Sequence, residues 1–509
     1  MQAPMGGLLE FQKELWTRVA RKTREYSISG NERLCRAVDG YEKSFPDKFR
    51  RVPRETFLSR AQGADWIFVG DYHSLPQAQL EAARLLQELL PETLALEAFP
   101  SCYQATLDLW SESDHSAAEL LEMVEFDRLW GAVPRLGYET LLETARQLGI
   151  RLLAIDHRNR AADLPASIEE RDHHMARTLS ERARTPCMIL VGDVHLSPET
   201  LPRAMGLKRS VLFHQNHAPY YFRLLEEEKN IPALLQISPR RYVNQHTHPL
   251  LVEESFLYTL IGEEMAHEVA PVELMPDLLR SLAQLLGLDC DQEPTVLTTY
   301  DHEGQDLLAL MVPDEKAIRD LSRQLMIQGV GFLGDTGTLL IHLPGSNHLV
   351  EAAGKWIFRC RESAPSRRCS QAARFFYEMR LEAFGYLASS LVNPLRQVKD
   401  ADWYVDNLGL EFDLDQARRL EAALHRCWEE GDEAPLHRFP SPDTVAGLVL
   451  SRCLGQALGH DLLPFWHEHP DRRGEILDLL FLTGHGRREI QRSVTELAAY
   501  CQGGRKQSR

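Results

Sequence analysis

The sequence predicts an α/β protein with a mostly parallel sheet flanked by helices, followed by a small α+β module and a helical C-terminal region. Between about residues 64 and 245, short apolar runs such as WIFVG, RLLAID and CMILVGD alternate with longer segments of helical periodicity. This alternation is typical of βαβ units and a parallel sheet. The runs are continuously apolar, which indicates strands buried on both faces.

Each part of the chain has its own pattern. Residues 1–60 resemble charged helices, and the proline-broken stretch KFRRVPRETF ends them. The α/β domain is expected over 61–285 and the α+β module over 294–360. In that module, TVLTTYDHEGQDLLALMV predicts a hairpin, EKAIRDLSRQLMIQG a helix and VGFLGDTGTLLIHLPG a second strand pair. Helical periodicity then continues through 361–509.

Length and composition limit the function. A chain of 509 residues exceeds the usual size of one hydrophobic core, so several domains are expected. Its net charge of −17 argues against a nucleic-acid partner. Nothing resembles a signal peptide, and no apolar stretch is long enough to span a membrane. Nine scattered cysteines without a CxxC pair are typical of a reduced, cytoplasmic protein.

The pattern apolar-Val-Gly-Asp-x-His occurs twice, in WIFVGDYH and MILVGDVH, each time where a predicted strand ends. In parallel α/β sheets the carboxyl ends of the strands bring their loops together, and ligands bind there. One copy alone is more often a simple turn than a ligand site. Two copies at equivalent strand ends favour a function, so we expect Asp71, His73, Asp193 and His195 to share one pocket.

Two further strand ends carry polar residues. Glu97 ends the apolar strand TLALEAF, where a carboxylate is costly unless it is paired. Asp156 and His157 follow the strand LLAI. The segment EERDHHMARTL contains Arg171 and Asp172 and, taken alone, predicts a surface helix with an amphipathic stripe.

These side chains allow two kinds of chemistry. Carboxylates and imidazoles can hold a divalent metal ion, or they can act as a general acid and base. The candidate metal ligands are Asp71, His73, Glu97, Asp193 and His195. The histidines of HQNH at 214–217 lack a visible second pair of ligands, so we expect them at the surface.

The order of these motifs resembles the Tiki/TraB and erythromycin-esterase superfamily. Over about 60–260 it is most similar to the haem-binding ChaN-like branch, on a GxxH strand end, LxLEAF, LLAID, RDxxMA and a second VGxxH. The resemblance implies an α/β fold whose paired histidines and strand-end glutamate line one cavity. One departure is Asp71, which stands where many relatives have Glu. The site residues that the resemblance implies are His73, Glu97, Arg171, Asp172 and His195.

Three functions remain open at this point. The first is a hydrolase, metal-assisted or acid/base, acting on an ester or peptide bond in a small molecule or peptide. The second is a haem-binding protein in which Tyr72, Tyr103 or His157 ligates iron. The third is a catalytically inactive scaffold whose C-terminal half binds a protein partner. The cofactor is accordingly a divalent metal ion or haem.

Overall fold

The computed structural model divides the chain into two compact units, Lys13–Glu263 and Met1–Gln12 with Glu264–Arg509. Each unit is described by itself below. The structure describes residues 5–28, 32–157, 168–206, 209–227, 229–261, 272–290, 292–299, 302–312, 314–333, 337–342, 345–366, 368–430, 438–482 and 486–507.

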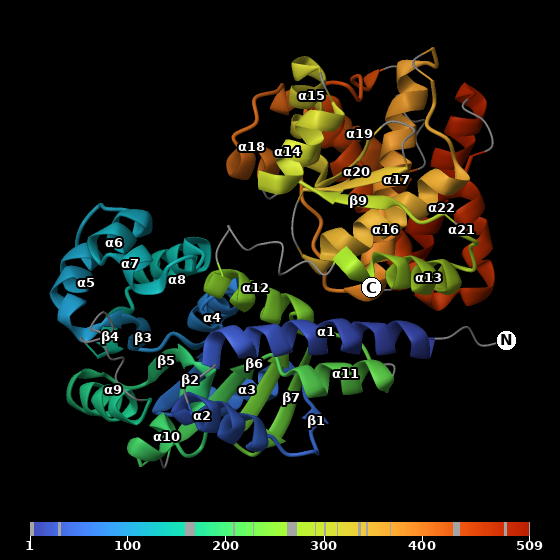
Figure 1. The fold of residues 1–509 in the computed structure, drawn as a ribbon. Helices are drawn as coiled ribbons and strands as arrows, with labels where there is room; N and C mark the ends of the chain where they lie inside the picture. The colour runs from blue at the N-terminus through green and yellow to red at the C-terminus, as the bar shows by residue number, and fades with distance from the viewer. Residues whose placement is uncertain are drawn as a thin grey trace. The chain divides into compact units, whose positions relative to one another are not determined.

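The first unit contains an eight-stranded sheet in the order β1-β7-β8-β6-β2-β5-β3-β4 (Figure 1). The strands from β8 to β4 run parallel, whereas β7 is antiparallel to β8 and to β1. The α/β fold class is therefore confirmed. The strands are β1 Arg50–Arg51, β2 Trp66–Asp71, β3 Thr93–Pro100, β4 Arg151–Asp156, β5 Cys187–Gly192, β6 Ser210–Gln215, β7 Ala233–Ser238 and β8 Arg241–Gln245.

Helices cover both faces of this sheet, which explains why its strands are continuously apolar. Ile67 and Val69 of β2 belong to one core cluster, and Phe68 between them belongs to the other. The first core includes residues of α3 Arg54–Gln62, α4 Pro76–Leu89, α5 Gln104–Ser111, α6 Ala117–Met123, α7 Phe126–Trp130 and α8 Arg135–Gln147. The second includes residues of α2 Glu32–Lys43, α9 Ile168–Arg182, the 3₁₀ turn η3 Asp193–Leu196 and α10 Leu201–Ala204. The remaining helices are α1 Met5–Ile28, α11 Ala218–Glu226 and α12 Pro249–Ile261.

The two copies of the repeated motif end neighbouring strands. β2 and β5 pair in parallel, and Asp71 lies opposite Gly192 at the end of the ladder. The first copy keeps its aspartate as the last residue of the strand. The second copy leaves the strand one residue earlier, so Asp193 begins η3. The expected meeting of the strand ends therefore occurs, with a one-residue difference between the copies.

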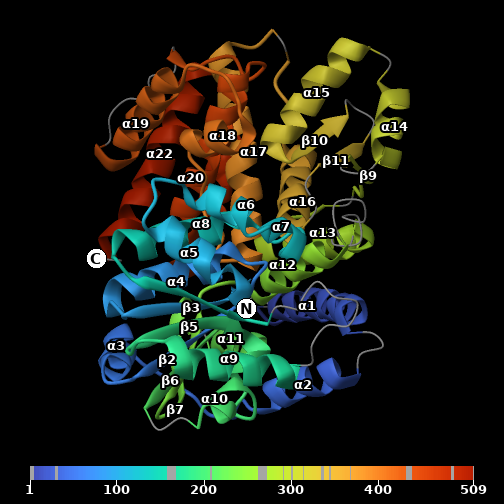
Figure 2. The same ribbon diagram turned by 90° about the vertical axis from the view of Figure 1, so that its left-hand side faces the viewer.

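The second unit contains a three-stranded sheet in the order β10-β11-β9, and Figure 2 shows α14 and α15 beside it. The strands are β9 Thr295–Thr298, β10 Val330–Leu333 and β11 Thr338–Ile341. The predicted hairpin after residue 295 is wrong, because β9 pairs in parallel with β11 and α14 His302–Met311 follows it. Leu308 of α14 packs with Leu325 and Leu340, so the apolar residues in this segment follow a helix and not a strand. The predicted antiparallel pair β10–β11 is confirmed.

The rest of this unit is helical, as expected. Its core contains a fully buried charge network, in which Lys355 Nζ lies 2.9 Å from Glu351 and 2.7 Å from Glu382. Arg452 contacts the same two carboxylates. No helix among the described residues is long and apolar enough to cross a membrane. The helices are α13 Met275–Leu286, α15 Glu315–Gln328, α16 Ser346–Arg361, α17 Gln371–Val392, α18 Ala401–Leu408, α19 Leu414–Glu430, α20 Val445–Glu468, α21 Arg473–Leu480 and α22 Arg487–Gln507.

Candidate active site

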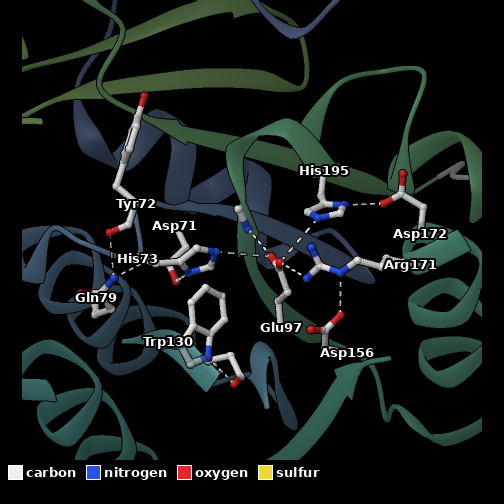
Figure 3. Close-up of polar contacts among 12 residues, drawn as sticks. Asp71, Tyr72, His73, Gln79, Glu97, Trp130, Asp156, Arg171, Asp172 and His195 are labelled. Atoms are coloured by element: carbon white, nitrogen blue, oxygen red, sulfur yellow. Dashed lines mark hydrogen bonds and ion pairs between the residues drawn. The ribbon is translucent and has the colours of Figure 1, made fainter. Parts of the chain in front are cut away.

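Glu97 of β3 lies at the centre of a polar cluster at the carboxyl ends of the strands (Figure 3). Its carboxylate is buried and accepts hydrogen bonds at both oxygens, from the Arg171 guanidinium at Oε1 and from the backbone N–H of Gly192 at Oε2. Arg171 Nε also lies 2.9 Å from Oδ1 of Asp156, at the end of β4. A buried carboxylate is stable only with such partners, so this pairing explains how Glu97 can lie within the apolar strand β3.

The two motif histidines lie on either side of this carboxylate. Nε2 of His73 is 3.8 Å from Oε2 of Glu97, and Nε2 of His195 is 3.5 Å from Oε1. Gly192 leaves room for this arrangement. A Cβ atom there would lie 3.1 Å from Nε2 of His73, 3.4 Å from Oε2 of Glu97 and 3.9 Å from Cδ2 of His195. The side chains of His73, Glu97 and His195 therefore lie around Gly192, whose lack of a side chain leaves room for them at the end of β5.

His73 is held through its other ring nitrogen. Nδ1 lies 2.8 Å from Oδ2 of Asp71 and 3.0 Å from the hydroxyl of Tyr138. Tyr138 donates to the same carboxylate oxygen at 2.6 Å, and Gln79 donates to the other one. Because an ionised aspartate only accepts hydrogen bonds, these partners assign a proton to Nδ1 of His73. The other ring nitrogen, Nε2, faces Glu97.

His195 is held by a different kind of partner. Its Nδ1 lies 2.6 Å from Oδ1 of Asp172, which reaches it from α9. Asp172 is buried, so α9 contributes a side chain to the site and is not only the surface helix that its sequence predicts. The motif's own aspartate, Asp193, does not hold this ring.

Charge and burial set the protonation states of the cluster. Burial alone would raise the pKa of Glu97, but the positive charges of His195 and Arg171 lower it well below its usual value. Burial would lower the pKa of His195, but Glu97 and Asp172 raise it to about 9. Burial raises the pKa of Asp172, against the hydrogen bond and the charge of His195. At neutral pH the cluster therefore contains an ionised Glu97 beside an imidazolium at His195.

Asp193 is buried against Gly70 and near the hydroxyls of Tyr72 and Tyr41. Neither of its carboxyl oxygens has a hydrogen bond in the part of the chain that the structure describes. Burial raises the pKa of Asp193 to about 8, and the hydroxyls of Tyr72 and Tyr41 lower it only in part. A Cβ atom on Gly70 would lie 2.0 Å from Oδ1 of Asp193, so the carboxyl packs directly against that glycine. Asp193 is therefore a packed, neutral acid at pH 7.

The three candidate haem ligands have other surroundings. The ring of Tyr72 points away from His73 and Glu97 (Figure 3), and burial raises its pKa well above 10. The Tyr103 hydroxyl donates to Oε2 of Glu125 at 2.8 Å. The ring centroid of His157 lies 4.9 Å from that of His174.

The cluster does not fit a multi-ligand metal ion as it stands, and two of its side chains are unsuited to haem iron. No group of three or more His, Cys, Asp or Glu side chains among the described residues has the geometry of a metal site. The oxygens of Glu97 and Asp71 are occupied by protein donors, and Asp193 packs elsewhere. Haem iron needs a ligand with a free lone pair. His195 is cationic and Tyr72 is a buried phenol, so neither supplies one.

Several residues that build the site could not be recognised from the sequence. Gln79 and Tyr138 come from apolar helices, α4 and α8, where helical periodicity alone suggests only packing. The ring of Trp130 lies 4.1 Å from that of His73, and its Nε1 donates to the Ala98 carbonyl. The surface position expected for the histidines of HQNH is wrong. His214 is fully buried and His217 nearly so, because the segment belongs to the central strand β6 and the turn after it.

Comparisons with known proteins agree with the sequence resemblance. Residues 57–165 match the family described as "Haem-binding uptake, Tiki superfamily, ChaN", so the resemblance to this family is confirmed for that segment. No curated protein matches the chain. A structure of cofacial haem binding to ChaN of Campylobacter jejuni is 15% identical, covers 38% of this chain and 92% of its own, and has a TM-score of 0.29. The structure of the type III effector HopBA1 is 18% identical, covers 33% of this chain and 86% of its own, and has a TM-score of 0.26. Both structural similarities are too weak to support an argument about function.

Proposed function

We propose that the cluster around Glu97 is the active site of a hydrolase that cleaves an ester or peptide bond, with His73 as its general base. The observation that supports this most is the orientation of His73. Asp71 and Tyr138 hold Nδ1, Nε2 is left to act on water once it carries the lone pair, and the side chain is 21% exposed. A fixed, neutral and solvent-reachable imidazole is what proton abstraction from water requires.

The roles of the other residues follow from their contacts. Nε2 of His73 takes a proton from water, and the water oxygen attacks the substrate carbonyl. Asp71 stabilises the imidazolium that forms, and the same proton then passes to the leaving group. Arg171 and the cationic His195 supply positive charge beside the oxyanion that develops. Glu97 is a poor base, because its oxygens already accept two hydrogen bonds and its pKa is low.

Turnover of model substrates tests this proposal. p-Nitrophenyl acetate and a fluorogenic peptide would be assayed with the full chain, with His73→Gln and with the control His115→Gln. His115 is an exposed histidine that pairs with Glu119 outside the site. We expect His73→Gln to lower kcat/KM by about 10²–10⁴-fold, the usual contribution of a general base, with an unchanged urea midpoint. Equal turnover by both variants would show that the activity does not come from this site.

Haem binding is the second candidate, and the family match over residues 57–165 favours it. Tyr72 is a buried phenol whose pKa is raised, so Tyr103 and His157 remain of the three candidate haem ligands. Burial and the hydrogen bond to Glu125 raise the pKa of Tyr103, which disfavours its phenolate. Tyr103 would therefore have to break its hydrogen bond to Glu125 in order to bind haem iron.

A haem titration tests this second candidate. Binding predicts a Soret band at equimolar haem that Tyr103→Phe or His157→Gln shifts or removes. The absence of a Soret band would exclude haem binding of this kind. If neither turnover nor haem binding were found, the inactive scaffold would be favoured. A cytoplasmic location is also part of our proposal, based on the scattered cysteines, and fractionation of cells would test it.

A further inference from the structure

A surface hollow lies in the α/β unit, outside the cluster around Glu97. It has a volume of about 620 Å³, and its wall includes Leu212 and Arg241. These two residues lie side by side in the sheet, because Leu212 of β6 pairs with Arg241 of β8. Leu212 belongs to the core on the α2, α9 and α10 face, so the hollow opens on that face.

Arg241 is held in place by neutral groups alone. Nη1 donates to the Ser44 carbonyl at 2.8 Å, and Nη2 donates to the Ser44 hydroxyl at 3.0 Å. Nε lies 3.4 Å from Nε2 of His214, and the guanidinium carbon lies 5.3 Å from the Phe45 ring centroid. Burial keeps the pKa of His214 well below its usual value, so this ring is neutral too. Within the described part of the chain, no carboxylate lies within ion-pair distance of Arg241.

Three other largely buried arginines differ in this respect. Arg171 pairs with Glu97 and Asp156, Arg380 pairs with Glu362, and Arg452 pairs with two glutamates. A cation removed from water without a counter-charge is unfavourable, and an anion placed beside it offsets that cost. Burial lowers the pKa of Arg241, as expected where compensation is lacking. The Arg241 guanidinium therefore lacks a counter-charge, which a bound anion would supply.

Among the described residues that line the hollow, Arg241 is the charged side chain without an ion-pair partner. Arg203 and Glu199 on the wall form an ion pair with each other, and both side chains are largely exposed. Pro198, Pro202 and Leu212 supply apolar surface. A guanidinium binds carboxylate and phosphate oxygens through paired N–H groups, and the apolar wall suits a short carbon chain.

We propose that this hollow binds a small organic acid, whose oxyanion group, a carboxylate or a phosphate, pairs with Arg241 while its carbon chain contacts Pro202 and Leu212. This site is separate from the Glu97 cluster and does not depend on the proposed hydrolysis. In this proposal Ser44 positions the guanidinium, because its carbonyl and its hydroxyl both accept hydrogen bonds from Arg241.

Calorimetric titration of the full chain tests the site at constant ionic strength. The probes are inorganic phosphate, acetate and hexanoate, with chloride as the reference anion. We expect saturable binding of at least one oxyanion, and hexanoate is expected to bind more tightly than acetate if the apolar wall contributes. Phosphate binding alone would identify a phosphate-bearing ligand, whereas carboxylate binding alone would identify a carboxylic acid.

Three variants test whether any binding depends on Arg241. Arg241→Gln should weaken binding by about tenfold or more, a loss of about 1.4 kcal/mol. Arg203→Gln is the matched control and should change affinity by less than about twofold. Arg241→Lys keeps the positive charge without the paired N–H groups, so this variant should bind the oxyanion only weakly. It replaces Arg241→Gln in the comparison if the glutamine variant does not fold. The proposal is overturned if no probe binds beyond chloride, or if the substitutions at 203 and 241 weaken binding equally.

Discussion

Asp172, on helix α9, holds the imidazole of His195, with Oδ1 lying 2.6 Å from Nδ1. Asp193, two residues before this histidine, packs against Gly70 instead. In the first motif copy the nearby aspartate does hold the ring, through the contact of Asp71 with His73. The two Gly-Asp-x-His copies therefore place their histidines alike but not their aspartates.

The first prediction concerns the charge of His195. Removing the charge of Asp172 with Asp172→Asn should lower the imidazolium pKa from about 9, because one of the two groups that raise it is lost. Asp193→Asn is the matched control and should leave this pKa nearly unchanged. Titration of the ¹⁵N-labelled histidine side chains by NMR measures both. An equal shift in the two variants would contradict the assignment of Asp172 as the partner.

The second prediction concerns Glu97. Glu97→Gln leaves the buried Arg171 and His195 without their shared counter-charge, so the free energy of unfolding should fall by about 3–5 kcal/mol. Glu92→Gln, at an exposed position just before the same strand, should change it by less than about 0.5 kcal/mol. Urea unfolding followed by circular dichroism compares the two. A loss below about 1 kcal/mol at Glu97 would mean that the cluster does not depend on this carboxylate.

The third prediction concerns pH. The folded-state pKa of Asp193 is about 8, above its value of about 3.9 in an unfolded chain. The folded state therefore binds more protons between these values, and this group makes the protein less stable as pH rises from about 4 to 8. The contribution reaches at most about 1.4 kcal/mol per pH unit.

Asp193→Asn removes that titration. The stability of Asp193→Asn relative to the wild-type chain should therefore rise steadily from pH 5 to pH 8 in urea unfolding. The difference between the two chains isolates Asp193 from other groups that titrate in this range. A difference that stays constant with pH would show that Asp193 is ionised throughout.

The fourth prediction separates the two motif glycines. Gly70→Ala places a Cβ atom 2.0 Å from Asp193, and overpacking of this kind should cost about 1–3 kcal/mol. Gly192→Ala meets Nε2 of His73 at 3.1 Å, so it should reduce ester turnover more than stability. Gly63→Ala is the control, since only the Arg60 carbonyl lies near, at 3.8 Å. Thermal unfolding and turnover would be measured together, and full activity of Gly192→Ala would count against His73 as the base.

The sequence predicts the sheet well because alternating apolar runs and helical segments leave few other arrangements. It also leads to His73, Glu97 and His195, since parallel strand ends must meet at one edge. It does not lead to Tyr138, because a helix residue that faces a site has the same spacing as one that faces a core. It wrongly groups Asp193 with the other donors, because β5 ends one residue earlier than β2 and the 3₁₀ turn redirects that side chain.

One donor to Glu97 is the main-chain amide of Gly192, which truncation of a side chain cannot delete. An alanine scan would leave this hydrogen bond in place and would underestimate how the carboxylate is anchored. Replacing the amide with an ester by chemical synthesis would reveal its share. Residual activity in a side-chain scan is therefore what this architecture leads us to expect.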